Sequence, residues 1–235
     1  MNVTTRRRPG ATGRSVTTPV RLFAGLSAQQ RKLVIQAAEL RSFPANSIIV
    51  TGGDPATHLL LLRRGRVKYY RVMKKGNEVL LGWLLPGDTF GIGTLLTEPE
   101  PHHLGTAEAV DACELLVWSR KSLRTLEEKI TEILAENAMR ILLYYLTEGA
   151  DRLVGLTAEP AKQRLARTLI RLCRRSGQTG ANGIELDITN ENLGALANIS
   201  PFTASRHLKR WERQGVIQKR RGKIAILSPE SLLPE

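Results

Sequence analysis

The stretch 189–223 constrains the fold of this chain more than any other part of its sequence. Thr189 or Asn190 can cap a short helix that has one apolar face. A second helix is expected to start after Ser200, with Pro201 in the first helical position, where the missing proline N–H costs nothing. The buried face of the second helix consists of apolar side chains four and three residues apart: Ala204, Leu208 and Trp211. Two short helices joined by a tight turn predict a helix-turn-helix.

The outer face of the second helix and the segment after it are rich in basic residues. Residues 217–220 and 223–227 have the pattern of two strands, and Arg221-Gly222 between them supplies a turn, so a basic β-hairpin, or wing, is expected. An ordinary helical hairpin with a solvated charged face is the alternative, and the basic wing argues against it. The side chains expected to face DNA are Phe202, Thr203, Ser205, Arg206, Lys209, Arg210, Arg220, Arg221 and Lys223.

These side chains are expected to have different roles. Arg206 lies one turn into the helix, where a guanidinium can bind guanine O6 and N7 together. Phe202 either touches a thymine methyl or packs under the turn, and Ser205 contacts a base edge or a phosphate. Lys209, Arg210 and the basic wing residues are expected to neutralise phosphates.

The distribution of charge supports a polyanionic partner more strongly than its total does. The formal net charge is +13 over 235 residues, and residues 157–235 hold 14 Lys and Arg against seven Asp and Glu. Residues 1–20 hold four Arg and no acid, and they are expected to form a disordered basic arm. This concentration of charge indicates double-stranded DNA as the partner. An architectural DNA binder without sequence preference is the alternative, and a helix with a defined reading face argues against it.

Cysteine usage and hydropathy exclude several classes of protein. Cys113 and Cys173 are far apart and flanked by apolar residues, so buried, reduced thiols are expected. The absence of a C-x-x-C motif gives no support for a zinc site or an iron–sulfur cluster. No apolar run approaches the roughly 18 residues of a membrane span, and no apolar core follows the amino-terminal Arg residues as in a secretory signal. The expected location is the cytoplasm, without a membrane partner.

The amino-terminal half changes from a helical to a strand pattern. A short helix with Leu33, Ala37 and Leu40 on one face comes first. Many short apolar runs follow, separated by turns that contain Gly or Pro, and they predict a small antiparallel barrel or jelly roll. The runs are 47–50, 58–62, 66–72, 78–84, 89–90, 105–110 and 114–119.

Three segments of this half resemble the cyclic-nucleotide-binding β-roll. They are the string 59–67, the turn Gly76-Asn77-Glu78-Val79-Leu80, and Leu85-Pro86-Gly87-Asp88-Thr89-Phe90-Gly91. Joined to a carboxy-terminal winged helix, they resemble the CRP/FNR family of bacterial transcription regulators, from about Leu22 to Ser228. The resemblance implies an α+β fold with an antiparallel β-roll (a jelly roll), a long dimerisation helix and a winged helix-turn-helix. The domains expected are the basic arm 1–20, the sensor roll 21–120, the dimerisation helix 121–156 and the DNA-binding domain 157–235.

The helical stretch 121–156, with a break near Lys129, has two apolar stripes. One stripe, with Ile130 and Leu134, can pack on the roll. The other recurs at alternating four- and three-residue steps, which is typical of a coiled-coil seam. A helix with two apolar stripes needs two partners, so the seam predicts a parallel homodimer, as the resemblance also implies. A single amphipathic helix inside a monomer is the alternative. The seam consists of Ala135, Met139, Leu142, Leu146, Gly149, Leu153 and Leu156.

The resemblance also implies a small effector in the roll, near Gly91, Ile92, His102, His103 and Leu104. Relatives that bind cAMP use a Gly-Glu pair and an Arg-Ser pair, which Gly91-Ile92 and His103-Leu104 replace here. A buried phosphate without its Arg is unfavourable, so cAMP is not expected to bind. No cofactor is predicted. A haem on His102 or His103, where a related CO sensor places its iron-binding His, another small effector and no effector at all are the alternatives.

The resemblance implies a dimeric, sequence-specific regulator that binds a palindromic DNA site and contacts RNA polymerase. Catalysis in the roll by His102 or His103 with Glu98 or Glu108 is the competing hypothesis. It lacks a nucleophile, base and orienting group at a meaningful spacing, so the protein is not expected to be an enzyme.

Overall fold

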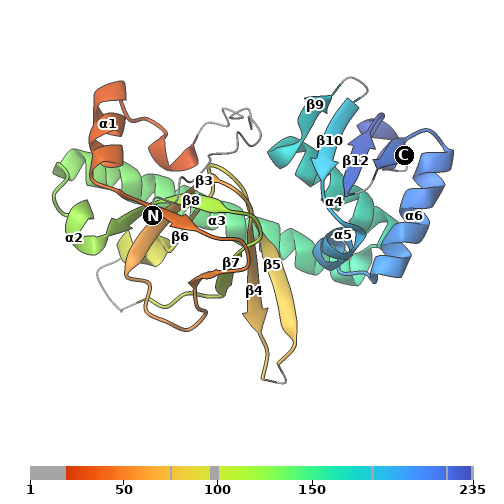
Figure 1. The fold of residues 1–235 in the computed structure, drawn as a ribbon, viewed down its shortest axis with the longest axis horizontal. Helices are drawn as coiled ribbons and strands as arrows, with labels where there is room; N and C mark the ends of the chain where they lie inside the picture. The colour runs from red at the N-terminus through yellow and green to blue at the C-terminus, as the bar shows by residue number, and fades with distance from the viewer. Residues whose placement is uncertain (1–19, 75, 96–100, 181–182, 221, 234–235) are drawn as a thin grey trace, which may run out of the picture.

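The computed structural model describes residues 20–74, 76–95, 101–180, 183–220 and 222–233. Two lobes are joined by one long helix, α3 (Glu128–Ala158), which runs along the first lobe and reaches the second (Figure 1). The basic arm expected at residues 1–20 lies, apart from Val20, outside the described residues. In the described part of the chain, no helix has the length and apolarity that a membrane span requires.

The amino-terminal lobe is a roll of two antiparallel sheets, as the strand pattern predicts. One sheet has the strand order β1-β8-β3-β6 and the other the order β2-β7-β4-β5. The strands are β1 (Glu39–Phe43), β2 (Ile48–Val50), β3 (His58–Arg64), β4 (Val67–Val72), β5 (Glu78–Leu84), β6 (Thr89–Phe90), β7 (Thr106–Ala109) and β8 (Cys113–Ser119). The short helices of this lobe are η1 (Arg21–Phe23), α1 (Ala28–Gln36), η2 (Ile92–Leu95) and α2 (Arg120–Leu123).

The run of four leucines in β3 is buried on both faces of its sheet. Leu60 and Leu62 point into the roll, where they join the core between the two sheets. Leu59 and Leu61 point outward, into a second core beneath η1, α1 and α3. Because side chains alternate along a strand, a strand covered on both faces must be apolar throughout, which explains the sequence of β3.

The first part of α3 packs on the outside of the roll. Ile130, Leu134 and Ile141 are buried in the outer core, as expected for the roll-facing stripe. The side-chain amide of the buried Asn137 donates to the carbonyl oxygens of Leu22 and Ala24, at 2.9 and 2.8 Å. These two bonds hold the chain around η1 against the helix, since they satisfy carbonyl groups that the turn leaves unpaired.

The observed amino-terminal helix, α1, is shorter than the helix that the sequence pattern suggests. The placement of Leu40 on one helix face with Leu33 and Ala37 is wrong: α1 ends at Gln36, and Leu40 lies in β1, paired with Leu116 of β8. The side chain that α1 buries fully is Val34. Sheet pairing outweighs helical periodicity here because β1 completes the edge of the sheet.

The carboxy-terminal lobe is a winged helix with its own apolar core. A sheet of order β11-β12-β10-β9 covers one side of its helices. The elements are α4 (Ala161–Ser176), β9 (Gln178–Gly180), β10 (Gly183–Asp187), α5 (Asn190–Ala197), α6 (Pro201–Arg213), β11 (Ile217–Arg220), β12 (Lys223–Ile226) and η3 (Pro229–Leu232).

Polar contacts join the two lobes. Asp88, in the turn before β6, forms an ion pair with Arg175 of α4, and both side chains are largely buried. Arg66, after β3, binds Asp111 of the roll at 2.6 Å and donates to the Asp187 carbonyl oxygen of β10 at 2.8 Å. Burial raises the pKa of Asp88, although Arg175 opposes that rise, so the carboxylate depends on its partner to stay charged.

This dependence predicts a loss of stability when the cation is removed. Arg175→Met is expected to lower the free energy of unfolding by roughly 3 kcal/mol, because it leaves Asp88 buried and unpaired. Urea denaturation followed by circular dichroism measures the change. Arg174→Met, at the exposed neighbour, is the control and is expected to stay within about 0.5 kcal/mol of the parent. Equal midpoints for the two variants would show that the Asp88–Arg175 pair adds nothing to stability.

Candidate nucleic-acid interface

The first helix of the motif, α5, is capped and turned as the sequence suggests. The Thr189 hydroxyl accepts a hydrogen bond from the Asn192 N–H at 3.2 Å, so Thr189 rather than Asn190 is the cap. The helix ends at Ala197 and is followed by Asn198, which is in the left-handed conformation at φ 51°. A Cβ at Gly194 would lie 2.9 Å from the Ile199 carbonyl oxygen, so only glycine lets the turn approach the helix this closely.

The second helix, α6, begins at a well-formed cap. The Ser200 hydroxyl accepts from the Thr203 N–H at 3.0 Å and is hydrogen-bonded to the Thr203 hydroxyl at 2.9 Å. Pro201 is the first helical residue. The predicted buried face is confirmed, and the opposite face is therefore oriented outward: Ala204, Leu208 and Trp211 are 0, 0 and 1% exposed.

Arg164 is a residue of this motif that sequence reasoning missed. Its guanidinium donates to the carbonyl oxygens of Ala197 and Asn198, at 3.2 and 3.3 Å, and to that of Glu159 at 2.6 Å. These contacts satisfy carbonyl groups at the end of α5 and tie the turn to the segment between α3 and α4. No local pattern reveals this role, because the partners lie up to 34 residues away in the sequence.

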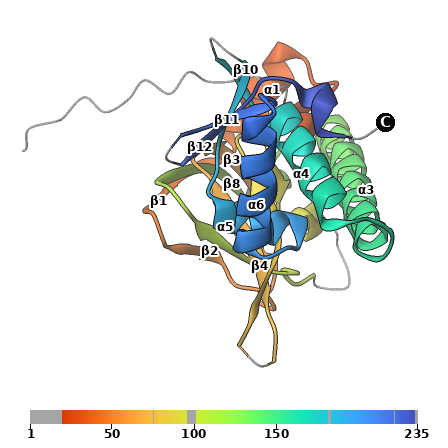
Figure 2. The same cartoon turned by 90° about the vertical axis from the view of Figure 1, so that its right-hand side faces the viewer.

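The outward face of α6 presents the predicted cations to solvent. Arg206, Lys209 and Arg210 are exposed, and α6 lies on the outer surface of its lobe (Figure 2). Phe202 is 78% exposed, so it does not pack under the turn. Ser205 and Thr203 are half-buried on the flank of the same helix, where the Thr203 hydroxyl is engaged with the cap.

The wing is a two-stranded hairpin next to α6. Strands β11 and β12 are antiparallel, and Arg220 is paired with Lys223 at the exposed end of the hairpin. Arg221 lies outside the described residues. The Glu212 carboxylate accepts from the Lys219 N–H at 2.9 Å and thereby anchors the wing to α6.

His207 does not add to the positive charge of this face. Its ring lies 6.3 Å from that of Trp211, between centroids. Burial and the neighbouring Arg206, Lys162 and Arg210 hold the pKa of His207 below its ordinary value. The imidazole is therefore neutral at pH 7, and the positive charge of α6 comes from its Arg and Lys residues.

The seam of α3 is apolar and exposed along its length in the single chain. Met139, Leu146 and Leu153 are 54, 68 and 66% exposed. Leu143 and Val154, which the seven-residue pattern leaves out, widen the stripe at 56 and 61% exposed. The remaining members, Ala135, Leu142, Gly149 and Leu156, are exposed too.

The five effector-pocket candidates lie in different surroundings. Gly91 has φ 68°, and a Cβ there would lie 2.2 Å from the His58 carbonyl oxygen. Ile92 begins η2 and packs on the outer core that α3 covers. His102 is exposed, and its backbone forms a bridge with Pro55, while Leu104 is 76% exposed.

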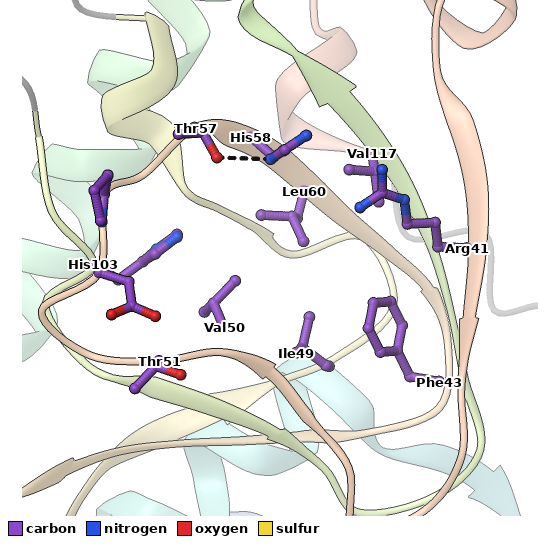
Figure 3. A pocket seen from close by; sticks show the side chains of 12 residues that line it. Arg41, Phe43, Ile49, Val50, Thr51, Thr57, His58, Leu60, His103 and Val117 are labelled. Carbon is purple, nitrogen blue, oxygen red and sulfur yellow. Dashed lines mark hydrogen bonds between the residues drawn. The ribbon is translucent and has the colours of Figure 1, made fainter.

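Of the five, His103 lines a cavity of about 200 Å³ inside the edge of the roll (Figure 3). Its backbone N–H donates to the Asp54 carbonyl oxygen, and its own carbonyl accepts from the Gly53 N–H, both at 2.9 Å. An apolar cavity of about 150 Å³ holds one benzene ring, so this volume is too small for a porphyrin. The residues around His103 thus do not fit a haem.

Two family models match the chain. The cyclic nucleotide-binding domain matches residues 40–129, and the Crp-like helix-turn-helix domain matches residues 163–234. The chain resembles the solved structure of FixK2 from Bradyrhizobium japonicum with a TM-score of 0.71, at 23% sequence identity, over 83% of this chain and 95% of that one. That likeness supports the fold of both lobes.

The chain is also similar to known proteins in its amino-acid sequence. The cyclic AMP receptor protein of Thermus thermophilus is 31% identical over 87% of this chain and 91% of its own length. The fumarate nitrate reduction regulatory protein of Klebsiella oxytoca is 27% identical over 78% of this chain and 72% of its own. The first of these relatives is named as a receptor protein and the second as a regulatory protein. With its β-roll, long helix and exposed basic α6, the chain belongs to the CRP/FNR family of DNA-binding transcription regulators.

Proposed function

We propose that the protein acts as a homodimer on a two-fold symmetric DNA site. Each copy would place α6 in the major groove and its wing on the neighbouring phosphates. The observation that carries this proposal is the capped α6, which exposes Arg206 beside Lys209 and Arg210 on the face opposite its buried core. A helix held in this way presents its first turns to base edges and its flanking cations to the backbone.

Dimerisation through α3 accounts for the exposed apolar seam. Met139, Leu146 and Leu153 would be costly in water, and a parallel copy of the same helix covers them with identical residues. A two-fold dimer matches half-sites whose centres lie about 34–36 Å apart, or multiples of that distance. The proposal includes action in the cytoplasm, where bacterial DNA lies, and contact with RNA polymerase beside the bound site.

Footprinting on genomic fragments tests the proposal. We expect protection of discrete sites with two similar, inverted halves, at protein concentrations that leave random DNA unprotected. Uniform protection of every fragment would instead indicate a DNA binder without sequence preference.

The sensor roll is not expected to respond to cyclic AMP, although one relative is named for that ligand. Ile92 packs on the outer core and offers no carboxylate to a ribose, and the Leu104 side chain offers no donor to a phosphate. Losing a charged Arg–phosphate contact removes several kcal/mol of binding energy. Calorimetry with cAMP or cGMP is therefore expected to show no binding tighter than millimolar, and micromolar affinity for either would contradict this assignment.

A further inference from the structure

The cavity at the edge of the roll has an apolar wall and a polar mouth. It opens between β1, the edge strand of one sheet, and β2, the edge strand of the other (Figure 3). Of the five effector-pocket candidates, its lining includes His103, at the place of the Arg in cAMP-binding relatives, and none of the other four. The apolar wall consists of Phe43, Ile49, Val50, Leu60 and Val117.

Three nitrogen-bearing side chains surround the mouth. The His103 ring points into the cavity, and among the described residues it has no hydrogen-bond partner (Figure 3). His58 is hydrogen-bonded through Nδ1 to the Thr57 hydroxyl at 2.9 Å, which leaves Nε2 for a ligand. Burial lowers the pKa of both imidazoles, so both are neutral at pH 7 and can donate or accept.

Arg41 supplies the positive charge of the mouth. Its guanidinium extends from β1 toward His58, and one terminal nitrogen is paired with Glu39 at 2.7 Å (Figure 3). Since a guanidinium carries five N–H donors, the others remain for a second anionic group. Asp54 also lines the cavity and acts electrostatically on His103, and its negative charge disfavours a ligand with two anionic groups.

We infer that this cavity binds a small monocarboxylate with a single ring or a branched apolar body. The body would lie on Phe43 and Leu60, and the carboxylate would accept hydrogen bonds from Arg41 and an imidazole. A volume of about 200 Å³ suits one ring with a short polar group, since an apolar cavity of about 150 Å³ holds benzene. The inference rests on the proposed function, because it names the chemical class of effector for the sensor roll.

The cavity wall is connected to the dimerisation helix. The Ala56 carbonyl oxygen, beside the cavity, accepts from the buried Thr94 hydroxyl of η2 at 2.9 Å. Ile92 and Leu95 of η2 pack in the same core as Ile130 and Leu134 of α3. These contacts link the segment beside the cavity to η2 and, through the shared core, to α3.

Binding to the full-length protein tests the inference. Benzoate, phenylacetate and isovalerate are the probes, benzamide is the uncharged control, and calorimetry is combined with the NMR resonances of the His imidazoles. We expect at least one carboxylate to bind and to move the His58 and His103 resonances, with benzamide at least tenfold weaker. Arg41→Gln is expected to raise the Kd at least tenfold, whereas Arg63→Gln, on the exposed part of β3, should stay within twofold.

Two outcomes would overturn the inference: no carboxylate moves either resonance at millimolar concentration, or Arg41→Gln binds as tightly as Arg63→Gln. Footprinting of the ligand-free protein and of both variants distinguishes a failure of this inference from a failure of the proposed function. An intact, symmetric footprint without carboxylate binding refutes the effector class alone. Absence of a footprint in the parent both with and without carboxylate counts against the proposed function, while the binding data still decide the ligand.

Discussion

Replacing Leu146 with glutamate is expected to convert the dimer into a monomer and to abolish specific DNA binding. Leu146 is 68% exposed in the single chain, so the variant loses no intramolecular core. In a parallel dimer the same position faces its own copy, and two carboxylates would be buried against each other without a partner, which costs several kcal/mol. Light scattering is expected to give a mass near 26.0 kDa for the variant and twice that for the parent.

Arg140→Glu is the matched control for this experiment. It places a carboxylate on the same helix, at an exposed position about 120° around the helix from Leu146. The control should remain dimeric and keep its footprint. If Leu146→Glu also stays dimeric, the seam from Met139 to Leu153 is not the interface, and the exposed stripe requires another partner.

Arg206→Ala is expected to weaken binding to the specific site by roughly 1–3 kcal/mol, or about 5- to 150-fold. The reason is that a bidentate contact to guanine O6 and N7 is lost while the helix itself remains intact. Arg206 is exposed and the fold of α6 depends on its opposite face, so the variant should keep the stability of the parent. Competition assays with substituted sites should show relaxed preference at one base pair in each half-site.

Lys223→Ala distinguishes sequence-specific contacts with bases from sequence-independent attraction to the DNA phosphates. Lys223 lies at the exposed end of the wing, where we expect it to contact phosphate and no base edge. Its loss should weaken all sequences alike and reduce the slope of log K against log salt by about 1. Equal weakening of specific and random DNA by Arg206→Ala would make Arg206 another phosphate contact and would remove it from the reading face.

Phe202 illustrates where sequence reasoning stops and side-chain placement begins. Its position in the first turn of α6 leaves two roles open, packing under the turn or contact with a base. Exposure of 78% excludes the first, because a packed aromatic ring would lose most of its contact with water. Burial depends on what the rest of the chain places beside a residue, and the sequence of α6 does not contain that information.

The polar contacts between the lobes and around the cavity were also beyond sequence reasoning. Asp88 and Arg175 are 87 residues apart, and their contact depends on how α4 docks against the roll. Arg41, His58 and His103 come from β1, β3 and the segment before β7, and they surround one cavity because the roll closes. The family resemblance predicted His103 as an effector-pocket residue. It did not predict Arg41 or His58, because neither belongs to a motif.

The sequence by itself determined the helix-turn-helix, its cap at Ser200, the buried face of α6, the many short strands and the two stripes of α3, and it left the first cap open between Thr189 and Asn190. Each of these follows from residues within about one helical turn or one strand, where capping and side-chain periodicity act. Only the tertiary structure decided the hydrogen bonds of Arg164 to the end of α5, the Asp88–Arg175 pair and the cavity at the edge of the roll. Those features require residues distant in the chain to meet, and which residues meet is set by how the sheets close and the lobes dock, which no local pattern encodes.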